Sequence, residues 1–153
     1  MSDDEKKSAK RATDKWNRTL RLTFSYEGST VRLVSSQSIE MKPPPAELEP
    51  IKKDQAGFYY ELVDTHGRPL YQHVIHNPIR LEEEIFSSEP NAPILTQKVE
   101  DPRGIFELLV PDAPDAHSVI LFSSPLDPAE SGRPAAELAR FQLTDKARHE
   151  GEQ

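Results

Sequence analysis

The clearest pattern in the chain is a pair of apolar runs that flank a short turn segment. The first run covers residues 58–63 and the second covers residues 70–75, with Asp64-Thr65-His66-Gly67 between them. Runs rich in β-branched and aromatic residues favour strands, and Asp and Gly favour tight turns. This part of the sequence therefore predicts a β-hairpin.

A similar alternation precedes the hairpin. Apolar and polar residues alternate from Leu20 to Tyr26, which is the period of a half-buried strand. A second strand is expected from Val31 to Met41, and its polar middle, Ser35 to Ser38, predicts an edge strand, a bulge or a bend. Pro43-Pro44-Pro45 ends that strand, because proline has no N–H to donate to a neighbouring strand.

Further short strands are predicted after the hairpin. We expect strands at residues 79–85 and 94–99, and we expect the latter to pair with residues 105–110 around a turn at Asp101-Pro102-Arg103-Gly104. The continuous apolar run at 119–122 predicts a central strand. About seven to eight strands with regular turn signals are typical of an all-β, antiparallel, immunoglobulin-like sandwich.

The distribution of polar residues divides the chain into three parts. Residues 1–15 predict a flexible charged arm, because they have few apolar side chains to offset the entropy of ordering. We predict that residues 16–125 form the β-sandwich domain. Residues 126–153 predict a linker, an edge strand near 137–144 and a disordered tail, so we expect one folded unit with flexible termini.

Composition narrows the range of functions. The chain has no cysteine, which excludes disulfides, thiolate nucleophiles and cysteine-ligated metal sites. A net charge of −7 argues against binding to nucleic acids and to anionic membrane surfaces. No apolar run has the length of a signal peptide or a membrane span, so we expect a cytoplasmic protein without membrane insertion. A chain from which a leader had been removed would show the same pattern.

Catalytic motifs are missing from the sequence. It contains no nucleophile elbow, P-loop, dinucleotide fingerprint or His-Glu-x-x-His motif. The run Glu82 to Glu84 is more typical of a solvated strand face than of acid–base catalysis. We therefore expect a non-catalytic protein with no cofactor, and the sequence leaves the identity of any small-molecule ligand unknown.

Histidines supply the main alternative, which is a metal-binding sensor or a metal-dependent enzyme. His73 and His76 would face opposite sides of a continuous strand, but a break near Asn77-Pro78 would let them share one metal ion. His117, which follows Asp112 and Asp115, is the third candidate ligand. Solvent-facing histidines at the end of a hairpin would give the same pattern.

Aromatic residues in the hairpin are candidates for binding. Tyr59 must face away from Phe58 and Tyr60, because neighbouring residues in a strand point to opposite faces. If one face is core, the other could present Tyr59 together with Tyr71 or His73 as a patch for a protein or a sugar. Tyr59, Tyr71 and His73 are therefore the predicted binding residues, and carbohydrate binding is a second alternative. Cross-strand packing alone would also explain these aromatic residues.

The segment from Phe58 to Tyr71 resembles bacterial immunoglobulin-like sandwich accessory domains. It has their apolar strand, Asp-x-x-Gly turn and Leu-Tyr return strand. More loosely, it is similar to the sandwich that precedes the catalytic domain in some bacterial metallopeptidases, although the metal-binding and catalytic motifs of those enzymes are absent. The resemblance implies a bacterial, non-catalytic accessory module. We therefore expect a protein-interaction or assembly module with a protein partner.

Overall fold

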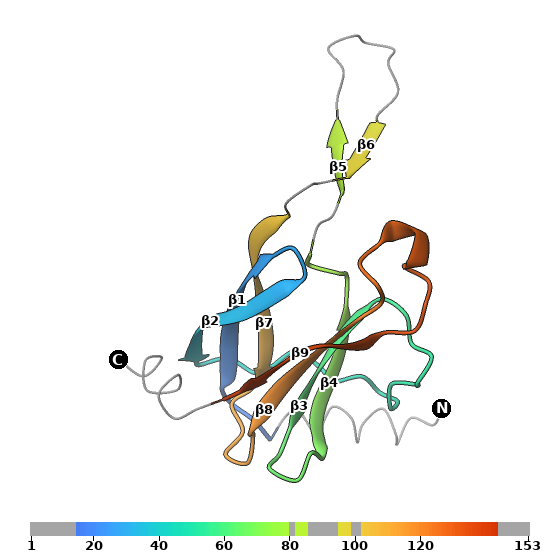
Figure 1. Ribbon diagram of the computed structural model, residues 1–153. Helices are drawn as coiled ribbons and strands as arrows, with labels where there is room; N and C mark the ends of the chain where they lie inside the picture. Colours follow the sequence, from blue (N-terminus) through green and yellow to red (C-terminus); the bar gives the residue numbers. More distant parts are fainter. Residues whose placement is uncertain (1–14, 80–81, 86–94, 99–101, 144–153) are drawn as a thin grey trace.

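The computed structural model describes residues 15–79, 82–85, 95–98 and 102–143. It is an all-β structure in which seven strands form two antiparallel sheets, as predicted (Figure 1). The immunoglobulin-like strand arrangement stays a prediction. Apart from Lys15, the predicted flexible arm (1–15) and tail (145–153) lie outside the described residues.

The first sheet has three strands in the order β2-β1-β7. Their bounds are β1 (Thr19–Glu27), β2 (Thr30–Ile39) and β7 (Arg103–Pro111). The second sheet has four strands in the order β4-β3-β8-β9. Their bounds are β3 (Phe58–Val63), β4 (Pro69–Ile75), β8 (Ser118–Ser123) and β9 (Ala136–Gln142). A short 3-10 helix, Pro128–Glu130, lies between β8 and β9.

A separate hairpin completes the described elements. It consists of β5 (Glu82–Ile85) and β6 (Leu95–Lys98), which pair with each other. Figure 1 shows the two strands standing away from the sandwich.

The core lies between the two sheets and is rich in phenylalanine. The Phe106 ring of β7 stacks on Phe24 of β1 at a centroid distance of 5.2 Å, and its edge meets Phe58 of β3 at 6.3 Å. Phe24 also contacts Phe141 of β9 at 5.2 Å. Each such pair contributes about 0.5–1.5 kcal/mol beyond the burial of its area. These rings hold the two sheets against each other.

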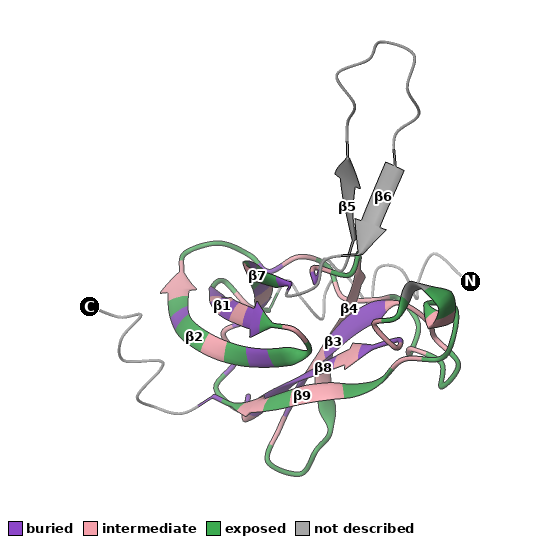
Figure 2. Cartoon of the chain, turned by 45° about the horizontal axis from the view of Figure 1, so that its top comes forward, coloured by how far each residue is buried: buried purple, intermediate pink, exposed green. Residues whose placement is uncertain are grey.

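Burial distinguishes central from edge strands. Figure 2 shows β3 mostly buried, whereas β2 and β9 have largely exposed or half-buried residues. β8 lies between β3 and β9, which confirms the prediction of a central strand. β9 is hydrogen-bonded to β8, so the sandwich continues beyond Pro125.

The polar middle of β2 marks an edge strand with a bulge, as predicted. The register with β1 shifts between Thr23 and Phe24, which face Ser35 and Leu33. Val34 is therefore the extra residue, and it is 58% exposed. A bulge of this kind twists an edge strand and discourages pairing with another chain.

The central hairpin is also confirmed, and its turn is held by Asp64. The carboxylate accepts the backbone N–H groups of His66 at 2.8 Å and Arg68 at 2.9 Å. The bond from Arg68 contributes most to a pKa of Asp64 below its usual range. Gly67 adopts a positive φ of 78°, which glycine tolerates without strain.

The predicted hairpin between residues 94–99 and 105–110 is wrong. β6 pairs with β5, and β7 pairs with β1 along its whole length. The local turn signal suggested a hairpin, but burial decided the pairing instead. The inward side chains Phe106, Leu108 and Val110 complete the core against β1.

One close packing contact gives a stability prediction. A Cβ built on Gly104 would lie 2.6 Å from the hydroxyl oxygen of Tyr26 and 2.8 Å from its ring, closer than real Cβ contacts allow. Tyr26 is directly across from Gly104 in the β1/β7 pair, and it is buried. We expect Gly104→Ala to displace the ring and destabilise the fold by about 1–3 kcal/mol, as overpacking does.

Chemical denaturation measures this change in the free energy of unfolding. The matched control is Gly132→Ala, because nothing lies within 4 Å of the Cβ it would add and its φ is not positive. Equal stability of the two variants would contradict the packing of Tyr26 on Gly104.

Candidate functional site

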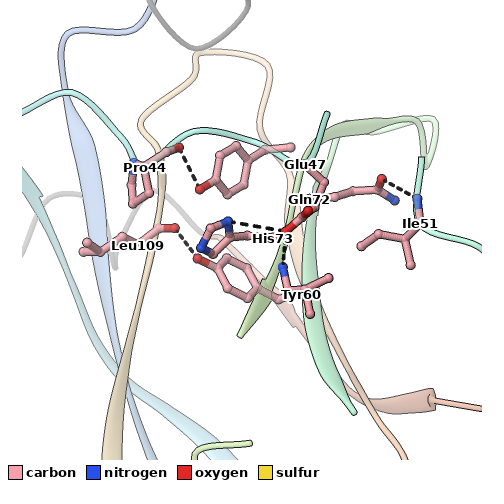
Figure 3. Close-up of polar contacts among 9 residues, drawn as sticks. Pro44, Glu47, Ile51, Tyr60, Gln72, His73 and Leu109 are labelled. Atoms are coloured by element: carbon pink, nitrogen blue, oxygen red, sulfur yellow. Dashed lines mark hydrogen bonds and ion pairs between the residues drawn. The ribbon is translucent and has the colours of Figure 1, made fainter. Parts of the chain in front are cut away.

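The most distinctive polar group of the sandwich lies around the hydrogen bond that joins Tyr60 of β3 to Leu109 of β7 in the other sheet (Figure 3). It comprises Glu47, Tyr60, Tyr71 and His73, which we call the tyrosine–histidine cluster. Strand pairing explains why they meet. Tyr60 pairs with His73, and Tyr71 lies two residues before His73, so all three point to the same face of the sheet.

Both tyrosine hydroxyls in the cluster have structural partners. The Tyr60 hydroxyl donates to the carbonyl oxygen of Leu109 in β7 at 2.7 Å. The Tyr71 hydroxyl donates to the carbonyl oxygen of Pro44 at 2.9 Å. Tyr60 thus links the two sheets, and Tyr71 links β4 to the connection between β2 and β3.

Burial keeps these phenols protonated. It raises the pKa of Tyr60 to about 12. Burial also raises the pKa of Tyr71, to which its neighbours Tyr60 and Glu47 contribute as well. At neutral pH both side chains are hydrogen-bond donors, and neither is suited to act as a base or a nucleophile.

Glu47 attaches the connection before β3 to the outer edge of β4. Its backbone N–H donates to the carbonyl oxygen of Gln72 at 3.0 Å. Its Oε1 accepts the backbone N–H of Val74 at 2.8 Å. Two neighbouring backbone groups of an edge strand are therefore occupied by a single residue.

His73 completes the cluster but makes no hydrogen bond at its Nδ1 atom. This nitrogen is 3.8 Å from Glu47 Oε1, which is beyond hydrogen-bond distance. Among the described residues, it is the only buried side-chain nitrogen or oxygen without a partner. Its ring lies 6.1 Å from that of Tyr71 and 5.9 Å from that of Tyr60.

The structure does not bring the predicted binding residues together. Tyr59 pairs with Val74 and stacks on Phe122 of β8 at 4.6 Å, so it lies on the face opposite to Tyr71 and His73. The predicted patch of Tyr59 with Tyr71 or His73 is therefore wrong. Tyr71 is only 2% exposed and offers no ring surface to a sugar or a protein. Whether Tyr59 or His73 contacts a partner stays a prediction.

The three candidate metal ligands are also separated. His76 follows Ile75, which pairs with Phe58 at the start of β3. The backbone N–H of His117 donates to the carbonyl oxygen of Val63 at the other end of β3. Within the described part of the chain, no three His, Cys, Asp or Glu side chains lie close enough to hold a metal ion. A single site made of His73, His76 and His117 is therefore excluded by the fold.

His117 lines a shallow pocket of about 330 Å³ at the turn end of the hairpin. The His117 Nδ1 atom is 2.7 Å from the Ser118 hydroxyl, and its Nε2 atom is 3.3 Å from Gln142 Nε2. Both ring nitrogens thus have polar neighbours from β8 and β9. This accounts for His117 as part of the local hydrogen bonding.

A second pocket, of about 440 Å³, lies at the β1/β2 turn beside the start of β7. Its lining is polar and contains two arginines: Ser25, Tyr26, Glu27, Thr30, Arg32 and Arg103. Arg103 pairs with Glu27 at 3.0 Å. Arg32 makes no ion pair with any residue that the structure describes.

Next to this pocket lies an exposed apolar side chain. Ile105, Ser25 and Arg32 form one row across β7, β1 and β2. Ile105 is 72% exposed, the highest value among the exposed large hydrophobic residues. Sequence reasoning missed this surface because β7 lies far along the chain from β1 and β2. Alternation in β7 was the available signal, since Phe106 and Leu108 point inward and Ile105 must therefore point outward.

Comparison with protein-family models, curated proteins and solved structures finds no match for this chain. Among the described residues, no helix has the length and apolar character needed to cross a membrane. Function is therefore inferred from the geometry and chemistry of the chain itself.

The inter-sheet hydrogen bond of Tyr60 gives the first prediction for this site. Tyr60→Phe removes the donor to Leu109 and leaves a carbonyl without its partner, so we expect a loss of about 1–2 kcal/mol of stability. Tyr59→Phe is the matched control, because the Tyr59 hydroxyl makes no hydrogen bond within the described residues. Urea unfolding checks both, and equal losses would contradict the linking role of Tyr60.

The raised pKa of Tyr60 predicts a loss of stability in alkali. The folded state keeps this phenol neutral up to a pKa of about 12, whereas in the unfolded chain it ionises near the ordinary tyrosine pKa of 10.0. Stability contributed by Tyr60 is thus complete below pH 10 and is lost as the pH rises from 10 towards 12. We expect the advantage of the wild type over Tyr60→Phe in Tm to shrink over this range. A constant difference between the two proteins up to pH 11.5 would contradict the burial of the phenol.

Proposed function

We propose that this chain is a non-catalytic protein-interaction module whose contact surface is the outer face of the three-stranded sheet β2-β1-β7. The observation that carries this proposal is the row formed by Ile105, Ser25 and Arg32. It places a strongly exposed apolar side chain beside an arginine without an ion pair in the described chain. Ile105 is the most exposed of the large apolar side chains that the structure describes, and it shares this row with a cationic side chain.

The composition of the row matches that of protein interfaces. Interface centres are enriched in apolar side chains and arginine, and a few such residues supply most of the binding energy. Among the neighbouring outward positions, Glu107 is charged and lies 4.0 Å from Arg21, whereas Thr23, Ser25 and Ser35 are small and hydroxylated. These side chains can hydrogen-bond to a partner, and they leave Ile105 accessible.

The chemistry of the adjacent pocket indicates an acidic partner. The planar guanidinium groups of Arg32 and Arg103 are suited to bind carboxylates with two parallel hydrogen bonds. Glu27 already pairs with Arg103, but both side chains are about two-thirds exposed, at 66% and 65%. Such an exposed pair is worth only about 0–1 kcal/mol. Arg32, which makes no ion pair in the described chain, is therefore the main candidate to bind a partner carboxylate.

The net charge of −7 opposes this interpretation only at long range. At physiological salt, charges separated by more than roughly 8 Å are largely screened from each other. A carboxylate in contact with Arg32 therefore responds mainly to the local arginines. We infer a partner segment that places an acidic residue in the pocket and an apolar residue over Ile105.

The tyrosine–histidine cluster is consistent with a non-catalytic protein. Its two phenol hydroxyls donate hydrogen bonds to backbone carbonyls, and the raised pKa values of the phenols keep them neutral. The cluster therefore supports the fold, while the outer face of the other sheet supplies the contact surface.

Charge reversal tests the proposed surface. We expect Arg32→Glu and Ile105→Asp to leave Tm nearly unchanged, because both side chains are exposed, and to weaken partner binding at least tenfold. The matched controls are Lys53→Glu and Leu48→Asp, which make the same changes at exposed positions in the connection before β3.

The measurement is quantitative affinity capture from a lysate of the organism that encodes the chain, at two salt concentrations. The proposal expects an acidic protein that is retained by the wild type and both controls and lost with Arg32→Glu and Ile105→Asp. Binding should also weaken as salt increases. Equal capture by all five proteins would contradict this surface.

A further inference from the structure

We propose that the chain pairs with a second copy of itself through the open edge of β9, so that their four-stranded sheets join into one continuous sheet. This inference concerns the second sheet and does not depend on the proposed contact surface. It rests on three observations: the β9 edge is open, the β4 edge is covered, and the second half of β9 is complementary to its own copy.

The two edges of the second sheet differ in how they are covered. At β4, Glu47 bonds to the backbone groups of Gln72 and Val74 through its own N–H and its carboxylate. At β9, no residue of the described chain outside β8 bonds to the backbone of residues 137–142. Figure 2 shows β9 at the rim of the sheet, with exposed and half-buried residues. An open edge of this kind is a template for another strand.

Strand pairing identifies which backbone groups of β9 are open. The N–H of Leu143 donates to the carbonyl oxygen of His117, at the end of the β8/β9 ladder. In an antiparallel pair, alternate residues direct both backbone groups to the same neighbour. Leu143 and Phe141 therefore face β8 with these groups, whereas the backbone N–H and C=O of Arg140 and Gln142 point away from the sheet.

A bulge restricts the usable edge to the second half of β9. Leu121 and Phe122 of β8 pair with Ala139 and Glu137, so Leu138 is the extra residue. A bulge disturbs the ladder locally and hinders the addition of a strand. From Ala139 onward the pairing with β8 is regular, and this stretch keeps the geometry that a further strand requires.

Twofold symmetry then favours a single register. Directly opposite residues point to the same face of a sheet, so in a symmetric antiparallel pair one residue must lie opposite its own copy. A centre at Arg140 would place two like charges opposite each other, which is destabilising. A centre at Phe141 places Arg140 of each copy opposite Gln142 of the other. The open backbone groups of these two residues then exchange hydrogen bonds in both directions.

The side chain at the centre of this register is suited to a symmetric contact. Phe141 is half-buried, and its ring contacts Phe24 of the core at 5.2 Å. In this register Phe141 and its copy form a non-hydrogen-bonded pair, in which the two side chains lie closest together. Aromatic residues at such positions stabilise a sheet. The pair would extend the phenylalanine core across the twofold axis.

The dimer has a consequence for binding. The proposed contact surface is the outer face of the sheet β2-β1-β7, which does not include β9. Both copies therefore keep this face free, and one dimer presents it twice. Two linked binding surfaces bind a partner that carries two matching sites more tightly than one surface does.

Sedimentation velocity of the full-length chain tests the pairing. We expect a monomer–dimer equilibrium between about 10 μM and 1 mM, the range in which small interfaces associate. Physiological salt is used, because it screens the repulsion between two copies of net charge −7.

A proline at position 142 removes the open edge from the pairing. Gln142→Pro deletes an N–H that β8 does not use, so the monomer should fold while each Arg140–Gln142 pair loses a hydrogen bond. We expect the dissociation constant to rise roughly tenfold or more. The matched control is Gln142→Ala, which removes the same side chain but keeps the N–H, and its dimer should remain.

Two charge variants keep the test decisive if Gln142→Pro folds poorly. Because Gln142 lies opposite Arg140 of the second copy, Gln142→Glu should tighten the dimer and Gln142→Lys should weaken it, each by roughly threefold or more. A wild type that stays monomeric throughout, or a dimer that responds to none of these changes, would overturn the proposal. A dimer that is lost with Ile105→Asp and kept with Gln142→Pro would also overturn it, because the copies would then associate through the first sheet.

Discussion

The packing of Phe106 against Phe24 and Phe58 is the interaction on which the rest of the structure depends. Phe106 is in β7 and Phe24 is in β1, so their stacking lies within the first sheet. The edge-on contact with Phe58 then connects that sheet to the second. Together with the contact of Phe24 on Phe141, it gives each sheet a partner for its apolar face, and sheets of this kind need such cover.

Hydrogen bonds from buried tyrosines hold the sandwich together beside the phenylalanine core. Tyr60 crosses to β7, and Tyr71 fixes the connection that carries Pro44 and Glu47. Because these hydroxyls are buried, removing either hydrogen bond would leave a buried polar group without a partner and would lower the stability of the fold. The result is an asymmetric molecule. The second sheet is braced along the edge formed by β4, whereas the outer face of the first sheet carries the exposed row of Ile105, Ser25 and Arg32.

Local patterns were enough to predict most strands and the central hairpin. Alternation identified β1, the Asp64 turn identified β3 and β4, and the polar middle of β2 identified an edge with a bulge. Which strands pair with each other could not be predicted, because β7 is joined to β1 by the burial of side chains that are far apart in sequence. For the same reason the tyrosine–histidine cluster could not be predicted. Alternation separates Tyr59 from Tyr60, but only the observed register places Tyr71 and His73 on the side of Tyr60.

The pairing of β1 with β7 has a consequence for the order of folding. About half of the chain separates the two strands, and β2 to β6 lie between them in sequence. Non-local pairings of this kind raise the contact order and slow folding, because a long loop must close before the stabilising contacts can form. During synthesis, the apolar side chains of Leu20, Leu22 and Phe24 in the β1–β2 hairpin therefore stay uncovered until β7 has been made. The N-terminal third of the chain is thus made first, but its sheet is complete only after β7 has been synthesised.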